Sequence, residues 1–209
     1  MTSELSSPAV PPRSRGRRQR AAGTREVIEE ATRELLKTRR IDEVTVQDIG
    51  DLAGVSRQTF YSHFETKYSV VAALVEEMGQ VIYAEWGDFL DADGPLSEKE
   101  LRQLGLVTLR RWREQATLFS ATIEGWHNDQ EIHDAWNEVL ERFAAALAQR
   151  VYRVRPRQAG DDMLFPVLIS LYERSVYLAV SAPDGPLGGS DTKLATVLAQ
   201  AWMRSLNLA

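Results

Sequence analysis

Apolar residues recur three and four positions apart over most of the chain after residue 24, which is the spacing of amphipathic helices. No segment shows the alternation of apolar and polar residues that is typical of a half-buried strand. Capping residues, glycines and prolines divide the pattern into helical segments. These segments are expected over residues 25–38, 45–53, 57–63, 67–90, 97–115, 117–126, 129–154, 161–182 and 191–207. The sequence therefore predicts an all-α protein.

Residues 45–64 contain two short predicted helices that are separated by one glycine. Thr45 and Asp48 have the spacing of a capping box at the start of the first helix. Gly54 lies where the chain must turn sharply, and Ser56 is placed to cap the second helix. Two short helices joined by such a turn have the dimensions of a helix-turn-helix, which places its second helix in the major groove of DNA.

The outward face of that second helix carries side chains suited to DNA. No acidic residue occurs from Val55 to Phe64, although the chain as a whole is acidic. Arginine and glutamine pair with base edges, hydroxyl and charged groups bond phosphates, and a helix N-terminus favours an anion. The expected base contacts come from Arg57, Gln58 and Ser62, and the expected phosphate contacts come from Thr45, Thr59, Tyr61, His63 and Lys67.

The amino-terminal segment differs from the rest of the chain in charge. Six of the first 25 residues are arginine and only Glu4 is acidic, while the whole chain has a net charge of −5. Residues 1–23 contain few large apolar side chains, so they are expected to be disordered when free. A basic arm on an acidic body orients a molecule toward a polyanion. Arg17 and Arg18 are therefore expected to contact phosphates or the minor groove.

The segment GVSRQTFYSHFETK, residues 54–67, resembles the DNA-binding signature of the TetR family of bacterial regulators. The likeness lies in the turn glycine, the run of Thr, aromatic, Tyr, any residue, His and Phe, and the lysine that opens the next helix. It implies a homodimer whose subunits each have a three-helix DNA-binding domain and a six-helix dimerisation and ligand-binding domain. In this sequence these domains are residues 24–68 and 69–209. The last two helices are expected to form the dimer interface.

The carboxy-terminal part has a second resemblance. The segments LISLYERSVYLAV and KLATVLAQAWMRSL, with a PDGPLGG loop between them, are similar to a subfamily of mycobacterial repressors that control ethionamide activation. That likeness implies an aromatic-lined tunnel along the helical body, whose occupant releases the protein from DNA. Trp136, Phe143 and Trp202 fall at aromatic positions of the tunnel. Ile169 and Tyr172 fall where the relatives have amide side chains, so a shared ligand does not follow.

Aromatic residues are concentrated after residue 85, where all five tryptophans lie. Aromatic side chains at helical spacing are ordinarily core, and this alternative stays open for each of them alone. Together they favour an apolar cavity with a few polar groups. Its expected lining is Trp112, Phe119, Trp136, Phe143, Tyr172, Glu173 and Trp202. Tyr172, Glu173 and Asn137 are candidate polar contacts, and the cavity would suit a cation as well as a neutral lipid-like ligand.

Other classes of function find little support in the sequence. The chain has no cysteine and only three histidines, and it contains no P-loop, G-x-S-x-G or G-x-G-x-x-G motif. No enzyme activity or cofactor is therefore expected. No apolar run approaches the ~20 residues of a membrane span, so a cytoplasmic location is expected. The alternative is a metal-binding helical bundle without DNA binding, with candidate ligands Glu124, His127, Asp129, Glu131 and His133.

These patterns together predict a ligand-responsive transcriptional regulator. It would be a homodimeric repressor that binds double-stranded operator DNA of palindromic sequence and is released by a small apolar or aromatic effector. The helix that begins at Lys67 connects the two expected domains, so its tilt would carry the signal between them.

Overall fold

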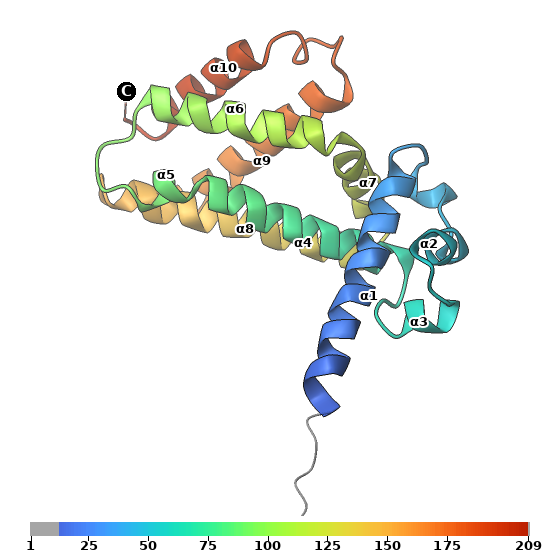
Figure 1. Cartoon of the computed structure of the whole chain (residues 1–209). Helices are drawn as coiled ribbons and strands as arrows, with labels where there is room; N and C mark the ends of the chain where they lie inside the picture. Colours follow the sequence, from blue (N-terminus) through green and yellow to red (C-terminus); the bar gives the residue numbers. More distant parts are fainter. Residues whose placement is uncertain (1–12, 209) are drawn as a thin grey trace, which may run out of the picture.

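The computed structural model describes residues 13–208, and the side chains within that range from residue 23 onward. All regular elements in residues 13–208 are helices, which agrees with the predicted all-α class (Figure 1). The elements are α1 (Arg13–Leu36), the 3-10 turn η1 (Ile41–Glu43), α2 (Val46–Ala53), α3 (Arg57–Tyr61), α4 (Lys67–Glu85), α5 (Gly87–Asp91), α6 (Glu98–Glu114), α7 (Ala116–Trp126), α8 (Gln130–Tyr152), α9 (Asp161–Ser181) and α10 (Asp191–Ser205).

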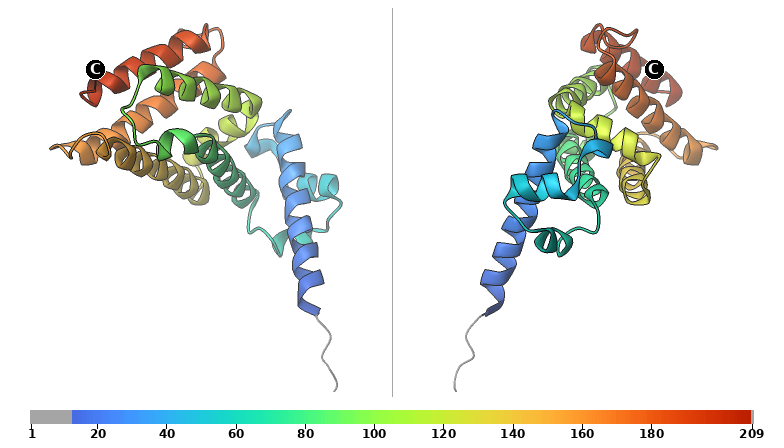
Figure 2. Two further views of the ribbon diagram at one scale, coloured as in Figure 1. Left: turned by 60° about the vertical axis from the view of Figure 1, so that its left-hand side comes forward. Right: turned by 90° about the vertical axis from the view of Figure 1, so that its right-hand side faces the viewer.

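The first three helices form a small unit at one end of the molecule, and the carboxy terminus lies at the other end (Figures 1 and 2). The unit has its own apolar core, in which Ile28, Ile49 and Phe60 are completely buried. α1 packs against both α2 and α4. The short helices α2 and α3 are therefore held by packing, since helices of this length are not stable alone.

The turn between α2 and α3 forms as the sequence predicts. Thr45 and Asp48 make the capping box, and Ser56 accepts a hydrogen bond from the N–H of Thr59 to cap α3. Gly54 has φ +67°, a left-handed conformation that a residue with a Cβ adopts only at a cost. The chain also turns closely enough that a Cβ on Gly50 would lie 3.0 Å from the carbonyl oxygen of Val55.

The larger body consists of α4 to α10 and encloses a second apolar core. α4 packs on α8, α6 packs on α10, and α9 contacts α8, α6 and α10 (Figure 1). A buried ion pair fixes the α8–α9 turn, where Arg155 donates to both carboxylate oxygens of Asp161 at 2.9 and 2.8 Å. The Arg155 guanidinium lowers the pKa of Asp161 to about 2, although burial opposes this shift.

Three expectations about the helices were wrong. The helix over 67–90 is divided into α4 and α5 at Trp86, so the body has seven helices rather than six. The apolar spacing also predicts that Val27 and Leu52 lie on the inner faces of their helices, but 45% and 54% of their surfaces are exposed. Apolar spacing alone does not fix which flank of a helical stripe the neighbouring helices cover.

The first helix begins at Arg13 rather than near residue 25, so the backbone of residues 13–23 is helical and not disordered. Arginine, glutamine and alanine are good helix formers, and this local preference extends a helix that is already anchored further along. The extension of α1 projects beyond α3 in both views of Figure 2. The expectation for residues 1–12 lies outside the described part of the chain.

α9 is an exception to the expectation that no segment is long and apolar enough to span a membrane. In the described residues it is one helix with the length and composition of a membrane span. Its apolar character has two sources, because one side packs into the core and another carries exposed apolar residues. The exposed residues of this stripe are Met163, Val167, Leu171 and Leu178.

Candidate DNA-binding face and effector cavity

The exposed surface of α3 is formed by side chains that are free to contact another molecule. Arg57, Gln58 and Tyr61 are exposed, and they make no hydrogen bond or ion pair with residues 23–208. The ring of Tyr61 rests edge-on against buried Phe60, with the ring centroids 5.5 Å apart. The core therefore fixes the position of the tyrosine ring while its hydroxyl stays at the surface.

Two hydroxyl groups of this region already have partners within the chain. The Thr59 hydroxyl lies 2.9 Å from the hydroxyl of Ser56, and the Ser62 hydroxyl donates to the carbonyl of Thr59 at 2.7 Å. A hydroxyl that donates in this way can still accept a hydrogen bond. His63 is half-buried beside them at the end of α3. Contacts of Thr59, Ser62 and His63 with DNA stay predictions.

Thr45 is occupied by the capping box of α2. Its N–H and its hydroxyl both donate to one carboxylate oxygen of Asp48, at 2.9 and 2.6 Å. The hydroxyl of Thr45 is the largest cause of the lowered pKa of Asp48. The two groups that were expected to meet a phosphate thus bind the chain's own carboxylate. A phosphate at Thr45 stays a prediction, and it would have to displace Asp48.

Lys67 has a structural partner that sequence reasoning missed. Its ammonium donates to the carbonyl oxygens of Asp42 and Val44, at 3.0 and 2.7 Å. Burial lowers the pKa of Lys67, while the charge of Asp42 raises it. The first residue of α4 therefore fastens the loop before α2. Lys67 has one further N–H for a phosphate, so that contact also stays a prediction.

The arginines of the arm are described only in part. Arg17 and Arg18 lie in the α1 extension, and their side chains are outside the described residues. The backbone of the extension projects past α3, at the same end of the molecule as Tyr61 (Figures 1 and 2). Their contact with DNA stays a prediction.

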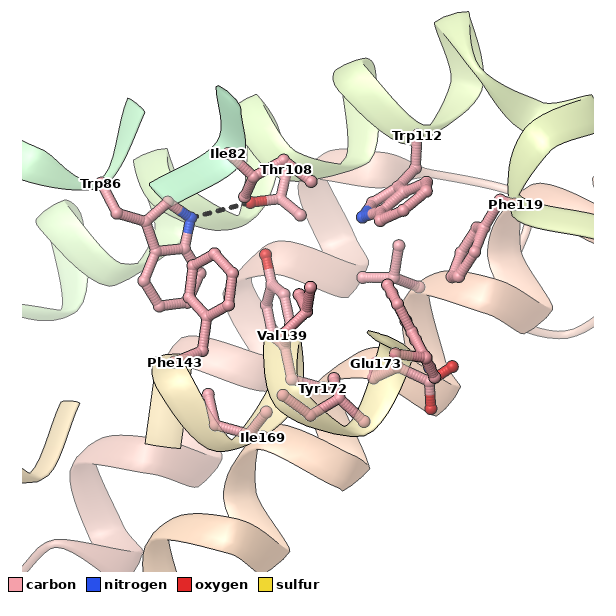
Figure 3. A pocket seen from close by; sticks show the side chains of 13 residues that line it. Ile82, Trp86, Thr108, Trp112, Phe119, Val139, Phe143, Ile169, Tyr172 and Glu173 are labelled. Carbon is pink, nitrogen blue, oxygen red and sulfur yellow. Dashed lines mark hydrogen bonds between the residues drawn. The ribbon is translucent and has the colours of Figure 1, made fainter. Parts of the chain in front are cut away.

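The larger body contains a cavity between two groups of aromatic rings (Figure 3). In one group the rings of Phe143 and Tyr172 lie 4.8 and 6.0 Å from that of Trp86. In the other, Trp112 stacks on Phe119 with centroids 3.9 Å apart, and Trp136 meets both. The cavity measures about 40 Å³. This is room for only a few water molecules.

Six of the seven residues predicted to line the cavity do so, and Trp202 does not. The Trp202 ring packs behind Tyr172 at 5.4 Å, so it supports the wall instead. Asn137 also lies elsewhere, because it bonds His133 near the α7–α8 turn. Sequence reasoning missed Trp86, whose position at the break between α4 and α5 was hidden inside one long predicted helix.

The cavity has few polar groups, and they lie in two places. The indole N–H of Trp86 donates to the hydroxyl of Thr108 at 3.1 Å, and the buried hydroxyl of Tyr172 has no hydrogen-bond partner in the described chain (Figure 3). Burial raises the pKa of Tyr172, although the nearby Thr108 hydroxyl opposes this shift, so the phenol stays protonated and able to donate. Burial also raises the pKa of Glu173 to about 7, although Arg174 opposes this shift.

Comparison with known proteins agrees with the arrangement of a three-helix unit and a helical body. The model for bacterial regulatory proteins of the tetR family matches residues 28–74, from α1 into α4. The HTH-type transcriptional regulator EthR of Mycobacterium tuberculosis is 35% identical over 99% of this chain and 98% of that protein. The chain belongs to the TetR family. It is a helix-turn-helix transcriptional regulator.

Three further proteins are similar to this TetR-family chain at lower sequence identity. EthR of Mycolicibacterium smegmatis is 23% identical over 82% of this chain and 81% of that protein. A TetR-family transcriptional regulator from Streptomyces coelicolor has the same fold, with a TM-score of 0.70 and 19% identity over 88% of this chain and 80% of that one. Salmonella enterica GusR gives a TM-score of 0.66 at 15% identity, over 88% of this chain and 96% of that one.

The residues of the alternative metal site have other roles in this TetR-family fold. Asp129 caps α8, Glu124 lies 3.5 Å from Arg40, and His133 stacks on Trp126. Among residues 23–208, no group of three or more histidine and acidic side chains is placed to hold a metal ion. The metal-binding alternative is therefore not supported.

Proposed function

We propose that the protein is a homodimeric cytoplasmic repressor that binds a palindromic operator and is released when a small effector occupies the cavity. The exposed face of α3 supports the DNA-binding part most directly. Arg57 and Gln58 have the donor geometry that reads guanine and adenine, and Tyr61 offers a hydroxyl to a phosphate. These side chains are exposed and have no partner in residues 23–208.

The exposed apolar stripe of α9 supports a dimer. Met163, Val167, Leu171 and Leu178 are between 39% and 66% exposed, and they recur along one helix. α10 adds Val197, which is 54% exposed. An apolar stripe of this kind on a protein in water marks an interaction surface. We therefore assign α9 and α10 to a four-helix interface between two subunits, which places the two α3 helices about one DNA turn apart, ~34–40 Å.

Contacts between the small unit and the body support a coupling between cavity and DNA. Leu36 of α1 and Ile41 of η1 pack into the core of the larger body. Arg33 of α1 lies 2.5 Å from Glu77 of α4, on the same side of the molecule. Since α4 also contributes Ile82 to the cavity lining, a shift of α4 reaches α1 directly. An effector that prefers the shifted state would lower DNA affinity.

The small size of the cavity supports a switch rather than a permanent ligand site. Ligand pockets commonly measure ~300–1,000 Å³, several times the volume between these rings. An effector must therefore move the walls apart when it binds. The helices that line the cavity include α4, the element that the small unit shares with the body. The cavity is thus expected to open only when α4 tilts.

The decisive experiment is selection of bound duplexes from a random DNA pool with the full-length protein. The expected result is a palindrome with half-sites about one helical turn apart, bound by a dimer in a mobility-shift assay. The matched variant Arg57→Ala should weaken binding and relax the preference at one base pair of each half-site, whereas Arg142→Ala on α8 should not. Failure to enrich any sequence would contradict the proposal.

A further inference from the structure

Glu173 is an acidic side chain without a partner in an apolar wall. It lines the cavity and is half-buried, and it makes no hydrogen bond or ion pair in the described chain. The neighbouring Arg174 does not reach it, because that guanidinium lies over the ring of Tyr177 at 5.1 Å. Burial takes part of the water away from this carboxylate and raises its pKa, and a partner of opposite charge would offset that cost. An unpaired carboxylate here is therefore available to a ligand.

The aromatic rings near Glu173 add a second feature that favours positive charge. Phe119 meets Tyr177, one turn after Glu173, with ring centroids 5.5 Å apart, and it stacks on Trp112. In Figure 3 the carboxylate of Glu173 lies on the Phe119 side of the cavity, away from Trp86. The faces of tryptophan and phenylalanine attract cations, most strongly where water is excluded. The described part of the chain places no lysine or arginine over the ring of Trp112 or the ring of Phe119.

The opposite end of the cavity differs in chemistry. There the Tyr172 hydroxyl points toward Thr108 and Trp86, and it remains a donor without a partner in the described residues (Figure 3). An unpaired buried donor is costly and is relieved by an acceptor on a ligand. Other residues of the lining are apolar, among them Val139, Ile169 and Val176. A ligand that uses the whole cavity would thus be apolar in its middle and polar at its ends.

We propose that the effector is a protonated arylalkylamine, with its ammonium group against Glu173 and the rings of Trp112 and Phe119. Its apolar part would pass between Val139 and Ile169, toward the Tyr172 hydroxyl. This inference rests on the proposed ligand-responsive function and specifies the class of ligand. Neutral lipids would fill the same walls but leave Glu173 unpaired, and carboxylates would be repelled by it.

Phenylbutylamine, phenylbutanol and phenylbutyrate provide a matched test, because they share one apolar body and differ in the charge at one end. Each is titrated into the full-length protein by calorimetry at about pH 8, where Glu173 is ionised. The amine should bind at least about tenfold more tightly than the alcohol, as expected for a desolvated cation beside a carboxylate and aromatic faces. The carboxylate should bind most weakly.

Glu173→Gln identifies the group responsible, with Glu141→Gln as the control that removes an exposed charge from the same body. Glu173→Gln should bring the affinities of amine and alcohol within about twofold of each other, while Glu141→Gln keeps the preference. Equal binding of amine and alcohol by the wild-type protein, or a preference that survives Glu173→Gln, would overturn the cationic assignment.

The same probes separate this inference from the proposed function. If the alcohol binds best and still releases operator DNA in a mobility-shift assay, the cationic assignment fails and the ligand-responsive repressor stands. If none of the probes binds, the cationic assignment fails as well. If the unliganded protein does not bind DNA at all, the proposed function fails, whereas the order of probe affinities still decides the chemistry of the cavity.

Discussion

The α3 face and the cavity both contain polar groups without protein partners, but their surroundings are opposite. Arg57, Gln58 and Tyr61 are in contact with water, which satisfies them until DNA replaces it. The hydroxyl of Tyr172, which lines the cavity, is buried, and no hydrogen-bond partner is found for it in the described chain. Water thus satisfies the polar groups of the DNA-binding face in the absence of DNA, whereas an empty cavity leaves a buried polar group unsatisfied at a cost in free energy. This difference suits a regulator that binds DNA when the cavity is empty and responds when an effector fills it.

The two regions also differ in their cores. The small core depends on a few large side chains, whereas the larger core extends over seven helices. Phe60→Ala should cost roughly 3–5 kcal/mol, because it removes a fully buried ring from the smaller core. DNA binding should be lost while effector binding to the body remains. Thermal unfolding followed by near-ultraviolet circular dichroism, together with a mobility-shift assay, measures both.

Tyr61→Ala is the matched control for Phe60→Ala, since it removes the neighbouring ring at an exposed position. It should weaken DNA binding without a comparable loss of stability. If Phe60→Ala destabilised the body as much as the small unit, the two cores would have to be treated as one.

Gly54→Ala should destabilise the small unit by roughly 1–2 kcal/mol, the cost of a left-handed conformation for a residue with a Cβ. No atom lies within 4 Å of the added Cβ, so backbone strain is the only cause. Gly87→Ala makes the same chemical change in the body, at a helical position with open space, and should not destabilise. Urea denaturation compares the two, and equal effects would refute the role of the turn.

Tyr61→Phe should weaken operator binding by about 1 kcal/mol, or roughly fivefold, because it removes one hydrogen bond to a phosphate and keeps the ring on Phe60. Fluorescence anisotropy at fixed salt measures the change. Tyr83→Phe in the body serves as the control and should leave DNA affinity as it was. Unchanged affinity for Tyr61→Phe would exclude the hydroxyl from the interface.

The smallest effect on DNA binding concerns Lys67. Lys67→Met should reduce the slope of log K against log salt by less than removal of a freely exposed lysine would, because the ammonium is partly engaged with the carbonyls of Asp42 and Val44. A lysine that neutralised a phosphate would instead reduce the slope by about 0.9 when removed. The variant should lower the stability of the small unit. A reduction by the full value of about 0.9 would show that Lys67 binds a phosphate through its remaining N–H.

The features that the sequence predicted most accurately are those that depend on residues close together in the chain. The caps at Thr45 and Ser56 and the turn at Gly54 follow from residue type and short-range hydrogen bonds, and all three are confirmed. The family resemblance and the all-α fold rest on the same local motifs, and they are confirmed as well.

What the sequence did not predict depends on distant parts of the chain. Lys67 meets carbonyls more than twenty residues earlier, and the indole N–H of Trp86 meets the hydroxyl of Thr108 on α6. Leu52 lies outside because no neighbouring helix covers that flank of α2. Such contacts depend on how helices dock, and the spacing of apolar residues within one helix does not contain that information.

Leu36 and Ile41 belong to the small unit by sequence but to the larger core by packing. This shared packing limits how freely regulators of this type can be recombined. A chimera that joins this DNA-binding unit to another effector body would bring two foreign side chains into a core shaped for others. In such a hybrid the side-chain volumes at positions 36 and 41 must fit the core of the new body before effector binding can change DNA affinity. Engineers who exchange DNA-binding units between such regulators therefore have to transfer the side chains at these two contact positions together with the unit.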